Sequence, residues 1–152
     1  MWIAGAFYGN DEVKTRDRFD AGDLLPLLGL DGFESLGNEY RQETDSAAAF
    51  IHTEWAVMED WRLTSGLRYT DEKKTFSDAF TYLIGGGEEA PLFPAVRNEY
   101  TTDNLSGKIG LDYTGFENML LYASVSKGFK SGGFQGQLTF EPSDLQPFEA
   151  PS

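Results

Sequence analysis

The sequence predicts an all-β fold, an antiparallel up-and-down meander of about five long strands that forms part of a larger transmembrane β-barrel. Three observations support this prediction. Aromatic residues, which favour strands, make up 14% of the 152-residue chain. Seventeen glycines and six prolines supply the residues that turns need. Several stretches alternate apolar and polar residues, and the connections between these stretches alternate between long and short.

Composition and charge exclude several classes of protein. The formal net charge of -13 argues against nucleic-acid binding, because a nucleic-acid partner requires a basic surface. The absence of cysteine excludes disulfide bonds, thiolate metal sites and cysteine nucleophiles. No run of eighteen apolar residues is present, so a transmembrane helix is excluded. Membrane-spanning β-strands leave only an alternating pattern and remain compatible with this sequence.

The first predicted strand covers residues 2–15. Its two faces consist of Trp2, Ala4, Ala6 and Tyr8 on one side and of Ile3, Gly5 and Phe7 on the other. The pattern leaves open which of these faces contacts lipid. Residues 16–41 lose the alternation and gather aspartate, glycine and asparagine, so they are predicted to form a long loop, in which LLPLLGL could make a short apolar turn or helix.

The second and third predicted strands cover residues 43–57 and 61–76, and a tight turn at 58–60 joins them. The third strand distinguishes its two faces most clearly. One face carries Leu63, Ser65, Leu67 and Tyr69, and the other carries Arg62, Thr64, Gly66, Arg68, Thr70, Glu72 and Lys74. Because the charges lie on one side only, we expect the apolar face to contact lipid and the polar face to line the barrel lumen.

The last two predicted strands follow a second long loop at residues 77–101, which contains three consecutive glycines and two prolines. The fourth strand covers residues 102–114, and a turn at 115–117 leads directly into the fifth. The fifth stretch, NMLLYASVSKGFKSGGF at 118–134, combines a strand-like alternation with a glycine-rich exit. We expect this exit to begin a third long loop.

The alternation of connection lengths separates a membrane barrel from a soluble sandwich. In outer-membrane barrels short turns lie on the periplasmic side and long loops lie outside the cell. Aromatic residues mark the strand ends, as interfacial girdles do: Trp55, Trp61, Tyr69, Tyr113 and Phe129. About five strands cannot close a barrel, since membrane barrels need about eight, so residues 1–152 are expected to be an internal piece. A soluble all-β binding module and a piece of a passive porin-like barrel remain the alternatives.

Three segments resemble the barrel of TonB-dependent outer-membrane receptors. They are SAAAF at 46–50, SGLRYTDEK at 65–73 and LYASVSKGFKSGGF at 121–134. The resemblance implies an importer, not an enzyme, in the outer membrane of a Gram-negative bacterium, with a barrel of about 22 strands. It also implies these partners: outer-membrane lipid, the remainder of the barrel, a plug domain, the TonB complex and a small-molecule ligand, most commonly a ferric siderophore. No segment resembles a plug domain, a signal peptide or a C-terminal barrel strand, so residues 1–152 are expected to be a partial receptor barrel.

Few residues suggest a specific site. His52 is the only histidine and no second one stands near it, so a metal site is not predicted. Residues 128–133 lack the spacing of a phosphate-binding loop. The sequence also suggests no set of nucleophile, general base and orienting residue that would form a catalytic site. No cofactor is therefore expected. The resemblance to importers, which take their ligand from outside, instead places a possible ligand-facing lumen wall at Arg68, Thr70, Glu72 and Lys130.

Overall fold

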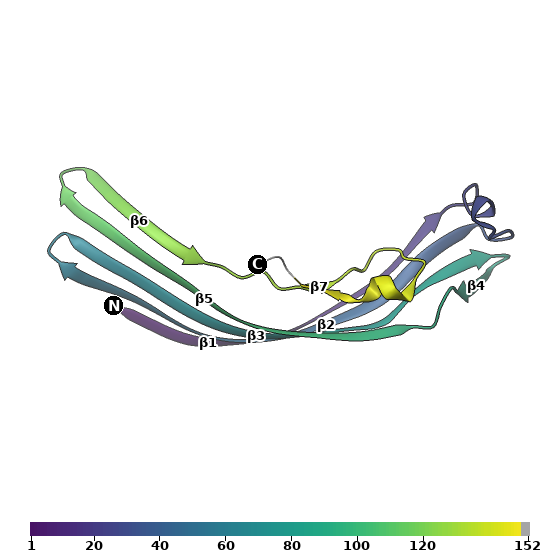
Figure 1. The fold of residues 1–152 in the computed structure, drawn as a ribbon, viewed down its shortest axis with the longest axis horizontal. Helices are drawn as coiled ribbons and strands as arrows, with labels where there is room; N and C mark the ends of the chain where they lie inside the picture. The colour runs from purple at the N-terminus through teal and green to yellow at the C-terminus, as the bar shows by residue number, and fades with distance from the viewer. Residues whose placement is uncertain (150–152) are drawn as a thin grey trace. The chain divides into compact units, whose positions relative to one another are not determined.

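The computed structural model describes residues 1–149, and most of them lie in strands (Figure 1). The elements in chain order are β1 (Trp2–Asp20), η1 (Pro26–Leu28), β2 (Ser35–Met58), β3 (Trp61–Gly85), β4 (Glu88–Pro91), β5 (Val96–Phe116), β6 (Met119–Lys127), β7 (Gly133–Phe134), η2 (Pro142–Leu145) and β8 (Pro147–Phe148). Among the described residues, no helix has both the length and the apolar character needed to cross a membrane.

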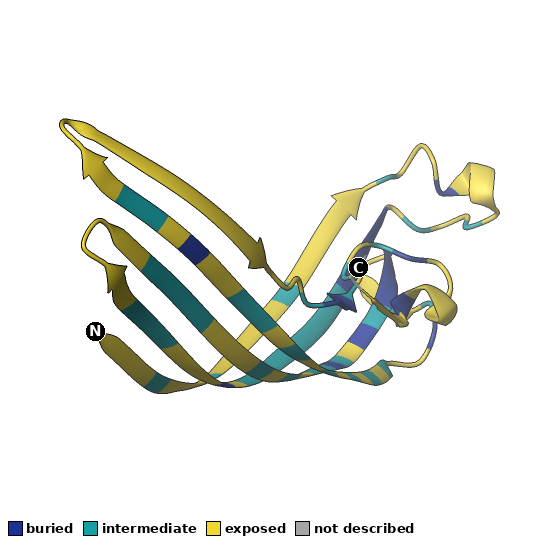
Figure 2. Cartoon of the chain, turned by 60° about the vertical axis from the view of Figure 1, so that its left-hand side comes forward, coloured by how far each residue is buried: buried dark blue, intermediate teal, exposed yellow. Residues whose placement is uncertain are grey.

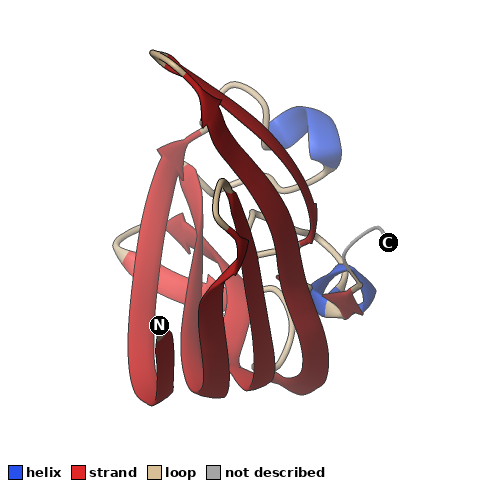
Figure 3. Ribbon diagram, turned by 90° about the vertical axis from the view of Figure 1, so that its left-hand side faces the viewer, coloured by secondary structure: helices blue, strands red, loops and turns tan. Residues whose placement is uncertain are grey.

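The main sheet confirms the predicted meander. Its strand order is β1-β2-β3-β5-β6, with β4 paired to β3, while β7 and β8 form a separate two-stranded sheet. Figure 3 shows the long strands running side by side and the two short 3-10 helices in segments outside the main sheet. Five long strands follow one another in sequence order, as the sequence predicted.

Two short turns are present where the sequence predicted them, but the second is shifted from the predicted 115–117 because β5 continues to Phe116. The first occupies residues 59 and 60 between β2 and β3, and the second occupies 117 and 118 between β5 and β6. Asn118 has a φ of 60°, a conformation that asparagine tolerates better than most residues. Beyond the second turn β6 ends at Lys127, so the glycine-rich part of the predicted fifth stretch leaves the strand.

The two predicted long loops are wrong in their extent. Strand β1 continues to Asp20 and β2 begins at Ser35, so the first connection is only residues 21–34. Strand β3 continues to Gly85, and the second connection contains β4 before β5 begins at Val96. The apolar alternation disappears in these segments because charged side chains replace the apolar ones. The segments are nevertheless strands, and cross-strand ion pairs such as Arg16 with Glu39 and Lys73 with Glu99 accompany the hydrogen bonds of the sheet.

Two compact units divide the chain, and each strand of the meander except β6 contributes to both. Unit 1 contains Met1–Gly9, Asp45–Glu72 and Thr101–Ser131. Unit 2 contains Asn10–Thr44, Lys73–Tyr100 and the chain from Gly132.

Unit 1 is a single-layered sheet with two different faces. Strands β5 and β6 pair antiparallel, and their register places Leu111 opposite Ala123 and Ile109 opposite Val125 on one face. The same register places Gly110 opposite Ser124 on the other. We call the first the outer face and the second the inner face. The outer face carries large, exposed apolar residues: Trp2, Ile51, Trp55, Val57, Leu67, Tyr69, Ile109, Leu111, Leu121 and Val125.

The structure also settles the orientation of β1, which the sequence left open. A Cβ added to Gly5 would lie 2.6 Å from the ring of Phe50, so Gly5 and Phe50 share one face. A Cβ on Gly66 would lie 3.4 Å from Nδ1 of His52, which alternation places on the same face as Phe50. Gly5 therefore belongs to the inner face, and Trp2, Ala4, Ala6 and Tyr8 belong to the outer face.

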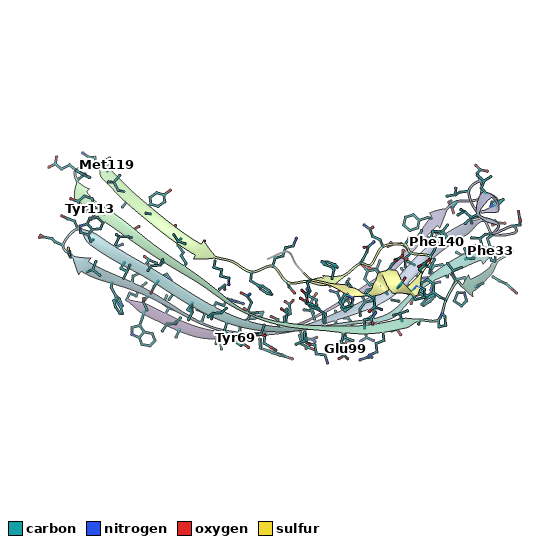
Figure 4. All side chains as sticks on the ribbon, in the orientation of Figure 1. Phe33, Tyr69, Glu99, Tyr113, Met119 and Phe140 are labelled. Carbon is teal, nitrogen blue, oxygen red and sulfur yellow. The ribbon has the colours of Figure 1, made fainter. Side chains whose placement is uncertain are left out.

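Aromatic rings cluster at the end of the β5–β6 hairpin, where Figure 4 labels Tyr113 and Met119. The ring centroid of Tyr113 lies 4.7 Å from that of Trp61 and 5.2 Å from that of Phe116. The Trp61 and Phe116 side chains are exposed. This arrangement is the one expected of an interfacial aromatic girdle beside a short turn.

Unit 2 is packed, unlike unit 1, as the buried positions in Figure 2 indicate. One core cluster contains Phe76, Ala79, Phe93 and Leu145, and a second contains Leu25, Leu36 and Leu83. Phe76 and Ala79 share a cluster although three positions separate them. Asp78, with a φ of 53°, lies between them and shifts the alternation by one residue.

The segment from Gly132 to Phe148 is held against the strands of unit 2 by hydrogen bonds to its backbone carbonyls. Nζ of Lys74 donates to the Gly132 carbonyl at 2.6 Å, and Nδ2 of Asn38 donates to the Gly136 carbonyl at 3.0 Å. Nδ2 of Asn98 donates to the Leu145 carbonyl at 2.9 Å. Three different strands therefore fix this segment, so it forms part of the folded unit.

Candidate functional site

The inner face of unit 1 contains a hollow of about 660 Å³. Strands β2, β3 and β5 and the residues that end or follow β6 contribute its lining. The lining residues are Ser46, Phe50, Ile51, His52, Gly66, Leu67, Arg68, Thr70, Glu72, Ser106, Gly107, Lys108, Lys127, Gly128 and Phe129. Most of the polar members lie on the inner face by alternation, so a polar ligand on this side of the sheet would meet charged, hydroxyl and aromatic groups.

Three of the four residues predicted for the lumen wall lie together in this hollow. Arg68, Thr70 and Glu72 follow one another on the inner face of β3. Nε of Arg68 donates a hydrogen bond to Oγ1 of Thr70 at 3.1 Å. Oγ of Ser131 donates to Oε1 of Glu72, which links the chain beyond β6 to β3. Arg68 is exposed, whereas Thr70 and Glu72 are half-buried.

Lys130 is the fourth predicted residue, and it does not line the hollow. Its side chain is exposed on the chain that follows β6, next to the Ser131 that contacts Glu72. Phe129, its other neighbour in sequence, does line the hollow. The predicted role of these four residues in ligand binding stays a prediction.

The sequence predicted a lumen-wall position for His52, which lines the hollow, but it did not predict Phe50 and Lys108 as members of this group. The signal was present, because alternation places Phe50 and His52 on one face of β2 and Lys108 on the polar face of β5. His52 contacts a single carboxylate, with Nε2 3.6 Å from Oε1 of Glu54. Across residues 1–149, no group of three or more histidine, cysteine, aspartate or glutamate side chains could hold a metal ion.

Unit 2 contains several ion pairs between exposed side chains. Lys73 donates a hydrogen bond to Glu99 across 3.0 Å, and this contact lowers the pKa of the Glu99 carboxyl. Lys14 does the same for Glu12 across 2.7 Å, and Arg41 adds to the effect. Because the pKa of each carboxyl is lowered, these ion pairs contribute their full stabilisation at a pH above the ordinary pKa of glutamate. That stabilisation is lost as the pH falls through the lowered pKa and the carboxyl becomes protonated.

Comparisons with known proteins agree with this architecture. The family described as TonB dependent receptor-like, beta-barrel matches residues 2–150. A solved structure, described as the ferric yersiniabactin uptake receptor FyuA from Yersinia pestis, is similar in fold with a TM-score of 0.75 and 16% sequence identity. The match covers 97% of this chain and 21% of that receptor, so the chain spans about a fifth of its length.

The family match covers nearly the whole chain, whereas the structural likeness concerns the fold alone. The two results agree with the strand order of the main sheet and with its apolar outer face. They exclude the soluble binding module that the alternating pattern by itself had left open. The chain therefore belongs to the TonB-dependent receptor-like β-barrel family, whose members lie in the outer membrane of Gram-negative bacteria.

Proposed function

We propose that the full-length protein imports a scarce solute across the outer membrane with energy supplied by TonB. In this proposal the chain contributes part of the barrel wall that the ligand passes, and a plug domain and the rest of the barrel complete the receptor. The observation that carries the proposal is the hollow on the inner face of unit 1. Its lining includes Arg68, Glu72 and Lys108, and the sheet that forms it matches the barrel of a receptor family. A passive barrel would conduct the solute without TonB.

We propose a ferric siderophore as the ligand. The chain as a whole has a net charge of -13, so an anionic ligand requires a local group of cations. Arg68 and Lys108 supply such cations from β3 and β5, and Lys127 adds one at the end of β6. Phe50 and Phe129 supply aromatic surface beside them. A ferric chelate with anionic oxygen donors and an organic backbone complements this combination of charge and aromatic contact.

Replacing Arg68 by Ala in the full-length protein is expected to weaken the binding of ferric siderophore by about 10- to 100-fold, because one charge-assisted hydrogen bond to the ligand is lost. Radio-iron uptake and equilibrium binding, measured with a catecholate, a hydroxamate and a carboxylate siderophore, check this. Arg62→Ala is the matched control, since Arg62 shares the inner-face alternation of β3 but does not line the hollow.

Two results would contradict the proposed function. Equal losses with Arg62→Ala and Arg68→Ala would remove the hollow from the account of binding. Uptake that continues unchanged in cells without TonB would favour the passive barrel instead. Binding of none of the three siderophore classes would reject the ligand class and leave TonB-dependent import of another solute to be tested by the same cells.

We also propose that the short turns face the periplasm and that the connections 21–34 and 86–95 lie outside the cell. In a cysteine-free background of the full-length protein, Glu88→Cys is expected to react with an impermeant thiol reagent on intact cells. Glu59→Cys, in the exposed turn between β2 and β3, is expected to react only after the outer membrane is opened. The reverse labelling pattern would overturn this topology.

A further inference from the structure

The outer face of unit 1 contains a second hollow, an open groove of about 640 Å³. Its lining is mostly apolar and comes from β2, β3, β5 and β6. The lining residues are Ile51, Thr53, Ser65, Gly66, Leu67, Leu105, Ser106, Gly107, Lys108, Ile109, Val125 and Lys127. The two hydroxyl groups on its outer face, those of Thr53 and Ser65, hydrogen-bond to each other at 2.7 Å, so they offer less to a polar ligand.

Gly107 gives the groove its floor. A Cβ added there would lie 3.3 Å from the carbonyl oxygen of Gly66 and 3.4 Å from Cδ1 of Leu67. Without that Cβ, a gap remains between the side chains of Leu67, Ile109 and Val125, which stand around it on the same face. A larger residue at position 107 would fill this gap at the cost of a small shift of its neighbours.

Lipid is the medium that surrounds this face, because the family resides in the outer membrane. The side chains that border the groove are open to that medium, with Ile109 55% and Val125 74% exposed. An apolar groove that faces lipid can bind an acyl chain. The methylene groups of the chain would fill the groove and make dispersion contacts with the Leu and Ile side chains.

Lys127 adds a charge at one edge of the groove. It lies directly opposite Gly107 in the β5–β6 register, at the end of β6. Within residues 1–149 no carboxylate forms an ion pair with it, in contrast to Lys14, which pairs with Glu12 at 2.7 Å, and Lys73, which pairs with Glu99 at 3.0 Å. An unneutralised ammonium group at the end of an apolar groove complements an anionic headgroup attached to an acyl chain.

We propose that the groove over Gly107 binds one membrane lipid with an anionic phosphate headgroup, with an acyl chain between Leu67, Ile109 and Val125 and the phosphate at the Nζ of Lys127. The linings of this groove and of the hollow proposed for the imported ligand share Leu67, Gly107 and Lys127, because one layer of sheet separates the two faces. The lipid proposal concerns the outer face and does not depend on the imported ligand. Its occupant is distinguished from the general lipid surroundings by the charge of Lys127 and by the space that Gly107 leaves.

The test uses the full-length protein in detergent and titrates it with phosphatidylglycerol, which is anionic, and with phosphatidylcholine, which is zwitterionic. Native mass spectrometry counts the bound lipids. We expect one phosphatidylglycerol to bind more tightly than the others, and Lys127→Gln to weaken it by about fivefold, the effect of one basic residue near a lipid surface. Lys127→Arg should restore it. Lys14→Gln should leave the affinity unchanged, because Glu12 already neutralises Lys14.

A second pair of variants tests the acyl-chain contact. Gly107→Leu fills the groove and should weaken both lipids, whereas Ala123→Leu adds a similar volume on the outer face outside the groove and should weaken neither. Four results would overturn the proposal: no preference for phosphatidylglycerol, equal affinity in Lys127→Gln and the parent protein, an equal loss in Lys14→Gln, or unchanged lipid binding in Gly107→Leu.

Discussion

Replacing Leu111 by Arg in the full-length protein is expected to destabilise the folded barrel by about 2 to 4 kcal/mol. Leu111 lies on the outer face, paired with Ala123 and 37% exposed. Its position in β5 is between the aromatic turn at Phe116 and the level of Lys127, so it falls within the apolar band. An arginine there would carry its charge into hydrocarbon or would have to reach out of it. Urea unfolding in phospholipid vesicles, followed by tryptophan fluorescence, measures the change.

Thr64→Arg is the matched control for this prediction. Thr64 belongs to the inner face, because a Cβ on Gly110 would lie 3.9 Å from the Cβ of Thr64 and 3.5 Å from that of Ser124. Lumen-facing positions tolerate charge, so the free energy of unfolding should change little. If both variants lose the same stability, then the two faces of unit 1 have been assigned incorrectly.

The sequence was sufficient to predict unit 1 because that unit is one layer between two different environments. Each strand there must present apolar residues to lipid on one side, while the other side also accepts polar and charged residues, and this leaves a period of two in the sequence. Leu63, Leu67 and Tyr69 show it on β3, and Ile109 and Leu111 show it on β5. Turn positions followed for the same reason, because the alternation stops at Met58 and near Phe116.

Unit 2 could not be predicted in the same way because its strands have no apolar outer band. Arg16 and Arg18 alternate with Asp17 and Phe19, so the pattern contains charge on both faces and resembles a loop. The segment from Gly132 was also missed. Its contacts join residues far apart in sequence, for example Asn38 with Gly136, and a search for local periodicity does not detect such pairs.

The candidate site was predictable in part. Arg68, Thr70 and Glu72 were found because they alternate along a single strand with a charged face. Phe50, His52 and Lys108 join them from neighbouring strands, and only the register between strands brings them together. Lys130 was placed on the same face by continuing the alternation of β6, but β6 ends at Lys127, and beyond that residue the period of two no longer applies.

Replacing Phe76 by Ala is expected to cost about 3 to 5 kcal/mol of unfolding free energy in unit 2 and to loosen the segment from Gly132. Phe76 is 1% exposed and belongs to the core cluster that contains Leu145. Its ring stacks on that of Phe134 with centroids 4.9 Å apart and lies 5.2 Å from the ring of Tyr40. Alanine would leave a cavity between β3 and the segment and would remove both ring contacts.

Urea unfolding and limited proteolysis of the full-length protein measure the two parts of this expectation. Phe19→Ala is the control, since Phe19 also belongs to unit 2 but is 49% exposed, and it should leave both unchanged. In Phe76→Ala, cleavage between Gly132 and Phe148 should become faster, because the bonds from Asn38 and Asn98 to the carbonyls of the segment remain but the apolar contact is lost. Lower stability without faster cleavage there would mean that the hydrogen bonds alone hold the segment, and that Phe76 stabilises only the strands beneath it.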